Sequence, residues 1–368
     1  MIDRVLPRPL LWLLATAFRL LPWPTRTGLR RVGRPRASSP VILTGNFALT
    51  VDRVLAAMRG VDAWLLVANS RGLNVWCASA GGHLTTHDVI SILKTSGVAE
   101  NVTHRQVVLP QLAAAGVEAD QVLQRTGWEV IWGPVDACHL PVFLERGGSD
   151  RMRLATFGAV HRLEMACMWA APLSLLVAVA AFLWPAGALP LMGMIWGLTL
   201  AVYLGFPLYE SLVARGSFVR FVALFGALAM AGTALVGALT GDLSIPFLLR
   251  WTGIGTAVVL LLGVDLAGST PLYKSWVQPE RQYRVDLSEE LCTACGRCAE
   301  VCPRGVFVIA GVASLPRAHD CEQCAACIVQ CPEDALSFAG PAGERVGPDI
   351  VRRHKLNMLG RRARTPSA

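Results

Sequence analysis

The sequence is short of charge. Only 16% of its 368 residues are Asp, Glu, Lys or Arg, against about 25% in a typical soluble protein. Between Glu164 and Glu210 there are 45 consecutive residues without any of these four side chains, and the mean hydropathy is +0.46. These values argue against an ordinary soluble enzyme, because part of the chain has the composition of a segment that lies in lipid.

Several functional signatures are also missing. The sequence contains no Gly-rich phosphate loop of the P-loop or dinucleotide type and no serine nucleophile elbow. It has no convincing secretory signal peptide, because the apolar stretch 10–21 is short, contains Arg19 and is followed by Pro-Trp-Pro. We interpret this stretch as an interfacial amphipathic helix within a basic N-terminal segment, residues 1–39.

The positive charge is concentrated at the two ends of the chain. Residues 1–36 carry a net charge of +7 and residues 343–368 carry +5, so the total of +8 leaves the middle of the chain negative. A nucleic-acid-binding core is therefore not implied, and nucleic acid is not an expected partner. Anionic membrane lipid is the simplest counterpart for the basic N-terminal segment and for the basic tail, residues 341–368.

Four apolar stretches within residues 166–267 predict a transmembrane domain, because each is long enough to cross about 30 Å of hydrocarbon. They cover residues 166–184, 187–208, 218–239 and 245–266. Lys and Arg lie in both flanks and between the second and third stretches, and none lies near Pro185 or Asp242. Since these residues accumulate on the cytoplasmic side, we expect a multi-pass protein of the cell inner membrane with both terminal parts cytoplasmic.

Residues 40–150 have the alternating pattern of an α/β domain. Short apolar runs predict strands at 41–43, 63–68, 106–109 and 129–132, and the intervening patterns predict helices at 51–59, 86–95 and 119–125. Strands that alternate with helices indicate a Rossmann-like parallel sheet. Such sheets bind ligands at the carboxyl ends of their strands.

Eight of the eleven cysteines form the strongest chemical signal. The pattern Cys-x2-Cys-x2-Cys-x3-Cys-Pro occurs twice between Cys292 and Cys331, and residues 285–340 resemble bacterial-type two-cluster ferredoxins of the α+β class. Zinc ribbons use paired Cys-x2-Cys knuckles and leave the x3-Cys-Pro ends unexplained. In the doubled pattern the fourth ligand of each [4Fe-4S] cluster comes from the other repeat. The predicted ligands are Cys292, Cys295, Cys298 and Cys331 for cluster 1, and Cys321, Cys324, Cys327 and Cys302 for cluster 2.

The other three cysteines have different surroundings. Cys138 and Cys167 lie among small or apolar neighbours, which favours a packing role. Cys77 belongs to the segment NVWCASAGG at 74–82, just after the predicted strand 63–68 and before a helix. A cofactor site of an α/β domain is expected at that place.

This segment resembles the corrinoid protein of anaerobic mercury methylation, whose cap helix carries an NVWCA(A/S)GK motif. The resemblance extends from Pro40 to about Leu144 and includes TGNFALT (44–50), LPQLAAAGV (109–117) and GWEVIWGPV (127–135). It also covers the order of parts, since that family has a membrane domain and works with a two-cluster ferredoxin, which here is fused at the carboxyl end. The corrinoid domain is in turn similar to the cobalamin-binding subunit of the acetyl-CoA synthase corrinoid iron–sulfur protein.

The resemblance implies a membrane-bound, corrinoid-dependent methyl-transfer protein. Cys77 would be the catalytic residue and the cobalt ligand, and Asn74, Trp76, Gly82 and Thr86 would help to bind the corrinoid. The fused clusters would return cobalt to Co(I) with two electrons after methyl transfer. The implied cofactors are a cobalamin-type corrinoid and two [4Fe-4S] clusters. The expected partners are membrane lipid, a methyl-donor corrinoid or methyltransferase, and a low-potential electron donor.

Two departures leave the methyl acceptor, Hg(II) or another, open. The family's Gly-Lys becomes Ala80-Gly81, and no cysteine follows Cys331, whereas the family's ferredoxin has further cysteines at its end. One alternative function is a membrane-anchored iron–sulfur electron-transfer protein without corrinoid, in which the α/β domain is a docking surface. A third interpretation uses Cys77, His83 and His87 as a zinc or iron site.

Overall fold

A computed structural model describes residues 7–19, 21–182, 185–213, 217–269 and 283–355. The chain divides into two compact units. One contains Pro22–Ala155 and Gln282–Ala368 together with the first twelve residues, and the other contains Leu13–Leu21 and Thr156–Arg281. The α/β part, within Pro22–Ala155, and the cysteine-rich part, within Gln282–Ala368, therefore belong to a single unit.

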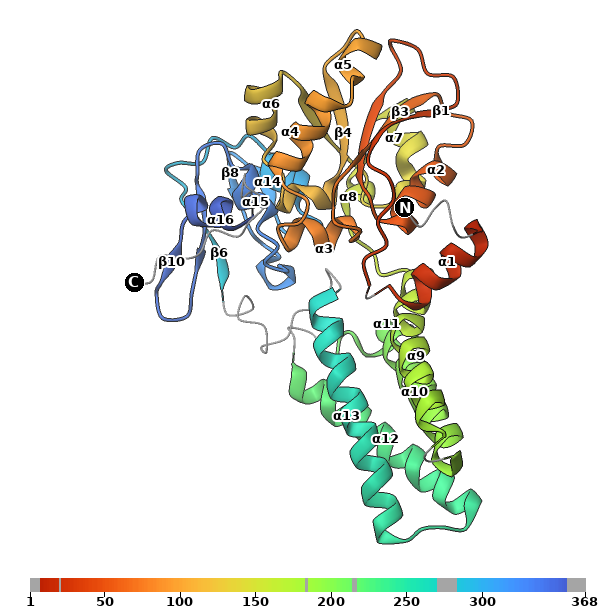
Figure 1. The fold of residues 1–368 in the computed structure, drawn as a ribbon. Helices are drawn as coiled ribbons and strands as arrows, with labels where there is room; N and C mark the ends of the chain where they lie inside the picture. Colours follow the sequence, from red (N-terminus) through yellow and green to blue (C-terminus); the bar gives the residue numbers. More distant parts are fainter. Residues whose placement is uncertain (1–6, 20, 183–184, 214–216, 270–282, 356–368) are drawn as a thin grey trace. The chain divides into compact units, whose positions relative to one another are not determined.

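The α/β part is built on a five-stranded sheet with the order β1-β3-β2-β4-β5, of which Figure 1 labels β1, β3 and β4. Four strands are parallel, and they match the four predicted ones: β2 (Val41–Gly45), β3 (Ala63–Ala68), β4 (Gln106–Pro110) and β5 (Glu129–Gly133). The fifth, β1 (Gly28–Val32), pairs antiparallel with β3 at the edge. It lies in the predicted N-terminal segment 1–39, so the sheet begins earlier than the sequence indicated. An edge strand needs no continuous apolar run, and GLRRV has none.

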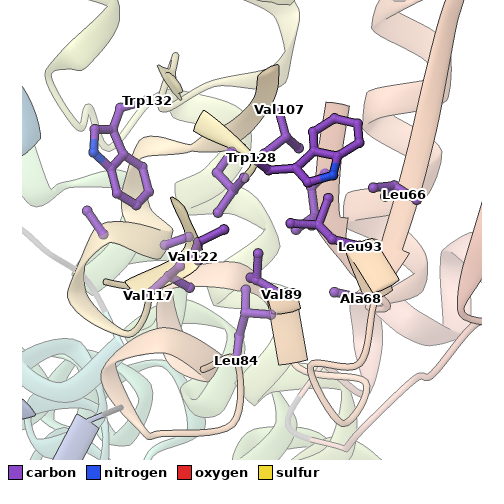
Figure 2. Close-up of a cluster of buried hydrophobic side chains, with 14 of the residues drawn as sticks. Leu66, Ala68, Leu84, Val89, Leu93, Val107, Val117, Val122, Trp128 and Trp132 are labelled. Carbon is purple, nitrogen blue, oxygen red and sulfur yellow. The ribbon is translucent and has the colours of Figure 1, made fainter. Parts of the chain in front are cut away.

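Helices cover both faces of this sheet. The side chains of α2 (Ala48–Ala57) pack with those of α7 (Leu140–Arg146) and the strands in one apolar cluster. The other face carries α4 (Thr86–Thr95) and α6 (Ala119–Thr126), and Figure 2 shows its core, where Val89 and Leu93 of α4 meet Leu66, Val107 and Trp128. The predicted helices are therefore confirmed, with ends that differ by up to three residues at α2.

The order of the strands places several loops at one edge of the sheet. β2 lies between β3 and β4, so the chain leaves the carboxyl ends of adjacent strands in opposite directions. The short helix α3 (Val75–Ala80) follows β3, and the 3-10 helix η2 (Gln111–Ala115) follows β4. Two small helices, α5 (Val98–Asn101) and α8 (Asp150–Arg153), and the 3-10 helix η3 (Ala137–His139) complete this part.

The cysteine-rich part has its own small sheet, three α-helices and a 3-10 helix among its described residues. The strands β6 (Arg284–Leu287), β9 (Leu336–Ala339) and β10 (Arg345–Val346) pair in the order β10-β9-β6, and β7 (Val308–Ala310) and β8 (Val312–Ser314) form a hairpin. The helices are α14 (Arg297–Val301), α15 (Ala326–Gln330), the 3-10 helix η6 (Ala318–Asp320) and α16 (Pro348–Lys355).

Part of the predicted basic tail 341–368 is folded. Residues of β10 and α16 belong to the cysteine-rich part, and the Arg352 side chain is only 21% exposed. Arg352 contradicts the lipid-facing interpretation at its own position, because it pairs with Glu118 and Asp334, whereas the Arg345 and Arg353 side chains are 69% and 56% exposed. Residues 356–368 of the tail lie outside the described residues.

The second unit is helical. It contains α9 (Ala159–Ala180), α10 (Pro185–Leu204), α11 (Phe206–Tyr209), α12 (Phe218–Thr240) and α13 (Ile245–Ser269). By length and composition four segments could cross a membrane: Ala159–Ala180, Gly187–Leu204, Phe218–Thr240 and Ile245–Leu266. Three cations counted in the sequence for orientation, Arg215, Lys274 and Arg281, lie outside the described residues.

Two buried polar side chains inside the helical unit, Tyr203 and Glu164, have polar partners. The Tyr203 hydroxyl donates to Asp265 Oδ2 at 2.7 Å, which joins α10 to α13. Glu164 on α9 is 4% exposed and pairs with Arg19 at 3.0 Å. The predicted amphipathic stretch 10–21 overlaps α1 (Arg8–Ala17). Arg19, near the end of this stretch, forms its ion pair within the helical unit, where the buried carboxylate needs a cation.

Candidate cofactor sites

Cys77 lies in the middle of α3, and Asn74 holds it at two atoms. The backbone N–H of Cys77 donates to Asn74 Oδ1 at 2.9 Å, which makes Asn74 the N-cap of the helix. The Asn74 Nδ2 group donates to Cys77 Sγ at 3.3 Å. Cys77 is partly exposed, so these hydrogen bonds hold a thiol at a residue that is not sealed in the core.

A buried polar network fixes the loop that leads into α3. Asn46, directly after β2, accepts at Oδ1 from the backbone N–H groups of Ser70 and Gly72, both at 2.9 Å. The Asn46 N–H donates to the Ser70 hydroxyl at 3.0 Å. Asn46 and Ser70 were not among the predicted site residues. The signal for Asn46 was present, because TGN ends a strand at the expected ligand edge.

Gly116, directly after η2, lies so close to the end of α3 that the two backbone segments are in contact. A Cβ atom at Gly116 would lie 2.5 Å from the Leu84 carbonyl oxygen and 2.8 Å from the Ser79 carbonyl oxygen. Only glycine leaves room for the two segments to approach this closely. Gly116 lies in the LPQLAAAGV segment, so this segment positions the Cys77 helix.

The other predicted corrinoid residues have distinct places. Gly82 has φ +71° in the turn after α3, a conformation that favours glycine. Trp76 is buried, at 8% exposure. Thr86 is 1% exposed, and its hydroxyl accepts from the Glu118 N–H at 3.0 Å. The structure therefore gives Thr86 a role in supporting the start of α6, and any contact with a corrin ring stays a prediction.

Within the described ranges, no three or more His, Cys, Asp or Glu side chains converge as ligands of a single metal ion. The helical spacing that suggested a zinc or iron site at Cys77, His83 and His87 is absent, because His83 lies before α4 and His87 lies on it. Cys77 lies on α3, and His87 lies on α4 beyond the turn at Gly82. A spacing of one helical turn brings two histidines together only when both lie on the same helix.

The first set of cysteines surrounds one pocket. Cys292, Cys295, Cys298 and Cys331 line it together with apolar side chains that include Leu287 and Ile309. These are the four cysteines predicted for cluster 1, one of them from the second repeat. Thiols around a pocket, rather than around a point, fit a multi-iron cluster better than a single ion.

The second set of cysteines lies near α15, and its members are buried or partly buried. Cys327 and Cys302 are 7% and 9% exposed. Burial raises the pKa of Cys321 to about 12, and repulsion from Cys324 and Cys302 adds to the rise. Burial likewise raises the pKa of Cys327, with Cys324, Cys321 and Cys302 among its charged neighbours. The four cysteines predicted for cluster 2 are therefore close enough to affect one another.

Such thiols need positive charge to become thiolates. In the first set, burial raises the pKa of Cys298 to about 11, with further contributions from Cys295, Cys331 and Cys292. Iron supplies the missing charge, because a coordinating thiol binds in its deprotonated form. The donor sets present fit [4Fe-4S] clusters.

The backbone of both cysteine loops has the same unusual conformation. Ala294 and Gly296 in the first repeat, and Gln323 and Ala325 in the second, have positive φ angles between 47° and 79°. Backbone that alternates between right- and left-handed conformations turns N–H groups inward and forms an anion-binding concavity. Non-glycine residues carry strain in this region, so the conformation points to a cluster whose sulfur atoms accept these N–H groups.

Backbone N–H groups also reach the cysteine sulfurs directly. Val306 N–H donates to Cys302 Sγ and Ala335 N–H to Cys331 Sγ, both at 3.3 Å. The two donors occupy equivalent places, four residues after the last cysteine of each repeat. Hydrogen bonds of this kind tune the reduction potential of an iron–sulfur cluster.

Of the two cysteines assigned to packing, one is not buried. Cys138 lies on η3 and is exposed, so its packing assignment is wrong. The short 3-10 helix turns its side chain outward although its neighbours in the sequence are small or apolar. Cys167 on α9 is partly buried.

Comparison with known proteins finds similarities for the α/β part and for the cysteine-rich part. Residues 14–144 match the family model of the CO dehydrogenase/acetyl-CoA synthase delta subunit, and residues 285–308 match that of the 4Fe-4S binding domain. The acetyl-CoA decarbonylase/synthase complex subunit gamma of Methanopyrus kandleri is 40% identical over 133 residues, 36% of this chain and 28% of that protein. The subunit gamma of Archaeoglobus fulgidus is 38% identical over 121 residues, 32% of this chain and 25% of that protein.

The chain thus covers about a quarter of the length of these relatives. The expected similarity to acetyl-CoA synthase subunits is confirmed, and it begins at residue 14 rather than at Pro40. The matches support a corrinoid-type domain fused to a ferredoxin-type domain. They do not support mercury methylation in particular. On the evidence of these matches, residues 14–144 are similar to acetyl-CoA synthase subunits and residues 285–308 to 4Fe-4S domains.

Proposed function

We propose that this chain is a membrane-bound, corrinoid-dependent methyl-transfer protein whose fused ferredoxin supplies electrons to the cobalt centre. The α/β part would bind the corrinoid, the cysteine-rich part would hold two [4Fe-4S] clusters, and the helical unit would anchor both in the cell inner membrane. The similarity of residues 14–144 to acetyl-CoA synthase subunits supports the first assignment.

The observation that carries this proposal is the arrangement around Cys77. Asn74 caps the helix with one side-chain atom and donates to Cys77 Sγ with the other, at the carboxyl edge of a parallel sheet. A thiolate is a soft, strongly donating ligand that suits a transition metal. A bound corrinoid would supply the organometallic chemistry, and Cys77 would act as its protein ligand, held in place by Asn74.

The protein's own residues divide the remaining tasks. Trp76 and the glycine at position 82 would shape the cap around Cys77. The cysteines Cys292, Cys295, Cys298 and Cys331 would hold one cluster, and the set Cys321, Cys324, Cys327 and Cys302 the other. Each cluster carries one electron at a time, so two clusters together can deliver the two electrons that resetting the cobalt centre requires.

The helical unit and the basic ends suggest the location. Four helices are long and apolar enough to span a membrane, and we propose that both terminal parts lie on the cytoplasmic side. Lipid would contact the helices and the basic N-terminal residues. A methyl-donor corrinoid or methyltransferase and a low-potential electron donor would be the soluble partners.

The methyl acceptor is not assigned to Hg(II). The motif lacks the lysine of the mercury-methylation family, with Gly81 in its place, and no cysteine after Cys331 can hand over mercury. Anaerobic methylmercury assays in cells that carry or lack the gene decide this point. Methylmercury formation only in cells with the gene would assign the acceptor.

A metal analysis of the purified protein tests whether it binds a corrinoid together with the iron–sulfur clusters. The protein is purified anaerobically, reconstituted with excess cobalamin and iron, and measured for cobalt and iron. We expect about eight iron atoms and one cobalt per chain, and a corrinoid absorption spectrum that changes in Cys77→Ala. Eight iron atoms without cobalt would overturn the proposal and leave the alternative, a membrane-anchored iron–sulfur electron-transfer protein.

A further inference from the structure

We propose that the cysteine-rich part is a fixed component of the α/β part rather than a detachable electron carrier, and that Gln330 is the positioning residue that holds it. A fused carrier can either dissociate between electron transfers or remain docked. The contacts between these two parts of one compact unit favour permanent docking, because each part completes the hydrogen bonds of the other.

Gln330, at the end of α15, is 3% exposed and makes three hydrogen bonds to the α/β part. Its Nε2 group donates to the carbonyl oxygens of Ala114 at 2.8 Å and Val117 at 2.6 Å. Its Oε1 atom accepts from the Ala119 N–H at 3.3 Å. Ala119 begins α6, whose own N-cap residue, Glu118, makes no side-chain cap. Gln330 therefore satisfies a helix end that the α/β part leaves open.

Gln111 makes the reciprocal contact. It is 1% exposed on η2, and its Nε2 group donates to the carbonyl oxygen of Glu300, near the end of α14, at 3.2 Å. A buried amide side chain from each of the two parts thus donates to backbone carbonyl oxygens of the other part. Separation of the two parts would leave these groups without partners until water reached them, which costs free energy at each one.

Charged side chains make further contacts between the two parts, beside Gln330 and Gln111. Arg297 on α14 pairs with Asp120 on α6 at 2.6 Å. Arg352 on α16 lies 3.9 Å from Glu118 Oε1, and it also donates to the Cys331 carbonyl oxygen at 2.7 Å. The segment 117–120 therefore has four consecutive residues in contact with the cysteine-rich part.

Buried apolar side chains also contribute to the contact between the two parts. Val301 and Ala326 are 1% and 3% exposed, and both belong to the apolar core of the α/β part, with Cys324 packed against it. Val301 and Gln330 occupy equivalent places, each directly before the last cysteine of its repeat. The pseudo-symmetric face made by α14 and α15 is thus the face that docks, one side with an apolar residue and the other with an amide.

The docked position bears on electron supply, a consequence that rests on the proposed function. η2 contacts α14 and α15 through Gln111 and the Ala114 carbonyl, and Gly116 follows it beneath the helix that carries Cys77. A fixed ferredoxin would serve Cys77 from one position. The external electron donor would then have to approach a surface other than the α14–α15 face.

The test measures docking in the full chain without corrinoid. Gln330→Met keeps the size of the side chain and removes its polar atoms. By hydrogen exchange, we expect the amides of residues 114–122 to exchange about tenfold faster or more, the effect of losing one to two net hydrogen bonds. Eight iron atoms per chain and an unchanged visible cluster spectrum establish that the clusters and their fold remain. Gln106→Met is the matched control, because Gln106 loses only an exposed contact with Glu129.

A second pair of variants separates docking from general stability. Arg297→Ala removes an ion pair across the docking surface, and Arg345→Ala removes one of equal length, 2.6 Å, to Asp286 within the cysteine-rich part. Only Arg297→Ala should add to the effect of Gln330→Met on residues 114–122. Unchanged exchange there in both Gln330→Met and the double variant would overturn the proposal. A cobalt-free chain that passes this test still shows docking, so failure of the proposed function is recognised separately.

Discussion

At the scale of single residues, Asn74 has two tasks that substitution can separate. Asn74→Ala removes both the helix cap and the hydrogen bond to Cys77 Sγ. Asn74→Asp keeps an oxygen that caps about as well as asparagine, but it replaces the N–H donor by a negative charge beside the sulfur. In cobalt-free protein we expect alkylation of Cys77 to be roughly three- to tenfold slower in Asn74→Asp, because a nearby anion disfavours the thiolate.

Hydrogen exchange of residues 75–80 measures the cap itself. Loss of an N-cap costs ~1 kcal/mol, so these amides should exchange about fivefold faster in Asn74→Ala and nearly as in the wild type in Asn74→Asp. Thr85→Ala is the control, since it removes the cap of α4 without touching Cys77. Equal alkylation rates in all three variants would show that Asn74 does not act on the sulfur.

How far the site could be predicted depends on the range of the interactions. The eight cysteines predicted as cluster ligands follow from spacing alone, and the proposed role of Cys77 follows from a motif of adjacent residues. Gln330 and Gln111 could not be found in this way. The partner of Gln330 Nε2 lies 216 residues earlier in the chain, and an amide side chain carries no local sign of what it will bond. Cys138 failed for the opposite reason, because apolar neighbours in sequence do not guarantee burial.

At the scale of elements, the contact between α3 and the residues that follow η2 decides where Cys77 sits. In Gly116→Ala the new Cβ would meet backbone oxygens that cannot rotate away. We expect the two elements to be forced apart and the domain to lose about 1–3 kcal/mol, as for other overpacked sites. The melting temperature of the full chain and hydrogen exchange of residues 75–80 measure this loss.

Gly127→Ala is a suitable control because glycine is favoured there by its backbone angle and not by close packing against another segment. Gly127 ends α6 with φ +72°, and a Cβ there would meet nothing within 4 Å. It should cost about 1–2 kcal/mol from backbone strain alone and leave residues 75–80 unchanged. If both variants affect α3 equally, close approach at Gly116 is not what positions the Cys77 helix.

The predictability of elements follows the same logic. Strands β2 to β5 are buried in a parallel sheet, so their apolar runs are visible in the sequence. β1 and β10 are edge strands with arginines, and α16 is polar except where Val351 is buried. Their place depends on a neighbour that supplies pairing, which no local pattern reports.

At the scale of the whole molecule, the order of the parts could be derived from composition, cysteine spacing and periodicity. The packing of the cysteine-rich part against the α/β part could not be derived in this way. More than 120 residues separate them in the sequence, and the surface that joins them is a mixture of amide, charged and apolar side chains. Composition distinguishes such a surface poorly from ordinary solvent-exposed surface.

Membrane topology is the last property that belongs to the molecule as a whole. Four spans, as proposed, would put the turn after α12 on the side opposite both terminal parts, and that turn carries Asp242 but no Lys or Arg. The start of α12, at Ser217, would lie on the cytoplasmic side. In a chain with Cys138→Ser, a membrane-impermeant maleimide should label Asp242→Cys in spheroplasts of intact inner membrane. It should label Ser217→Cys only after permeabilisation, because the arginines near Ser217 favour a cytoplasmic location for that side. Labelling of Ser217→Cys first would invert the topology, and the Cys77 site and both clusters would then face away from cytoplasmic electron donors. Equal labelling of both before permeabilisation would show that these helices do not span the membrane at all.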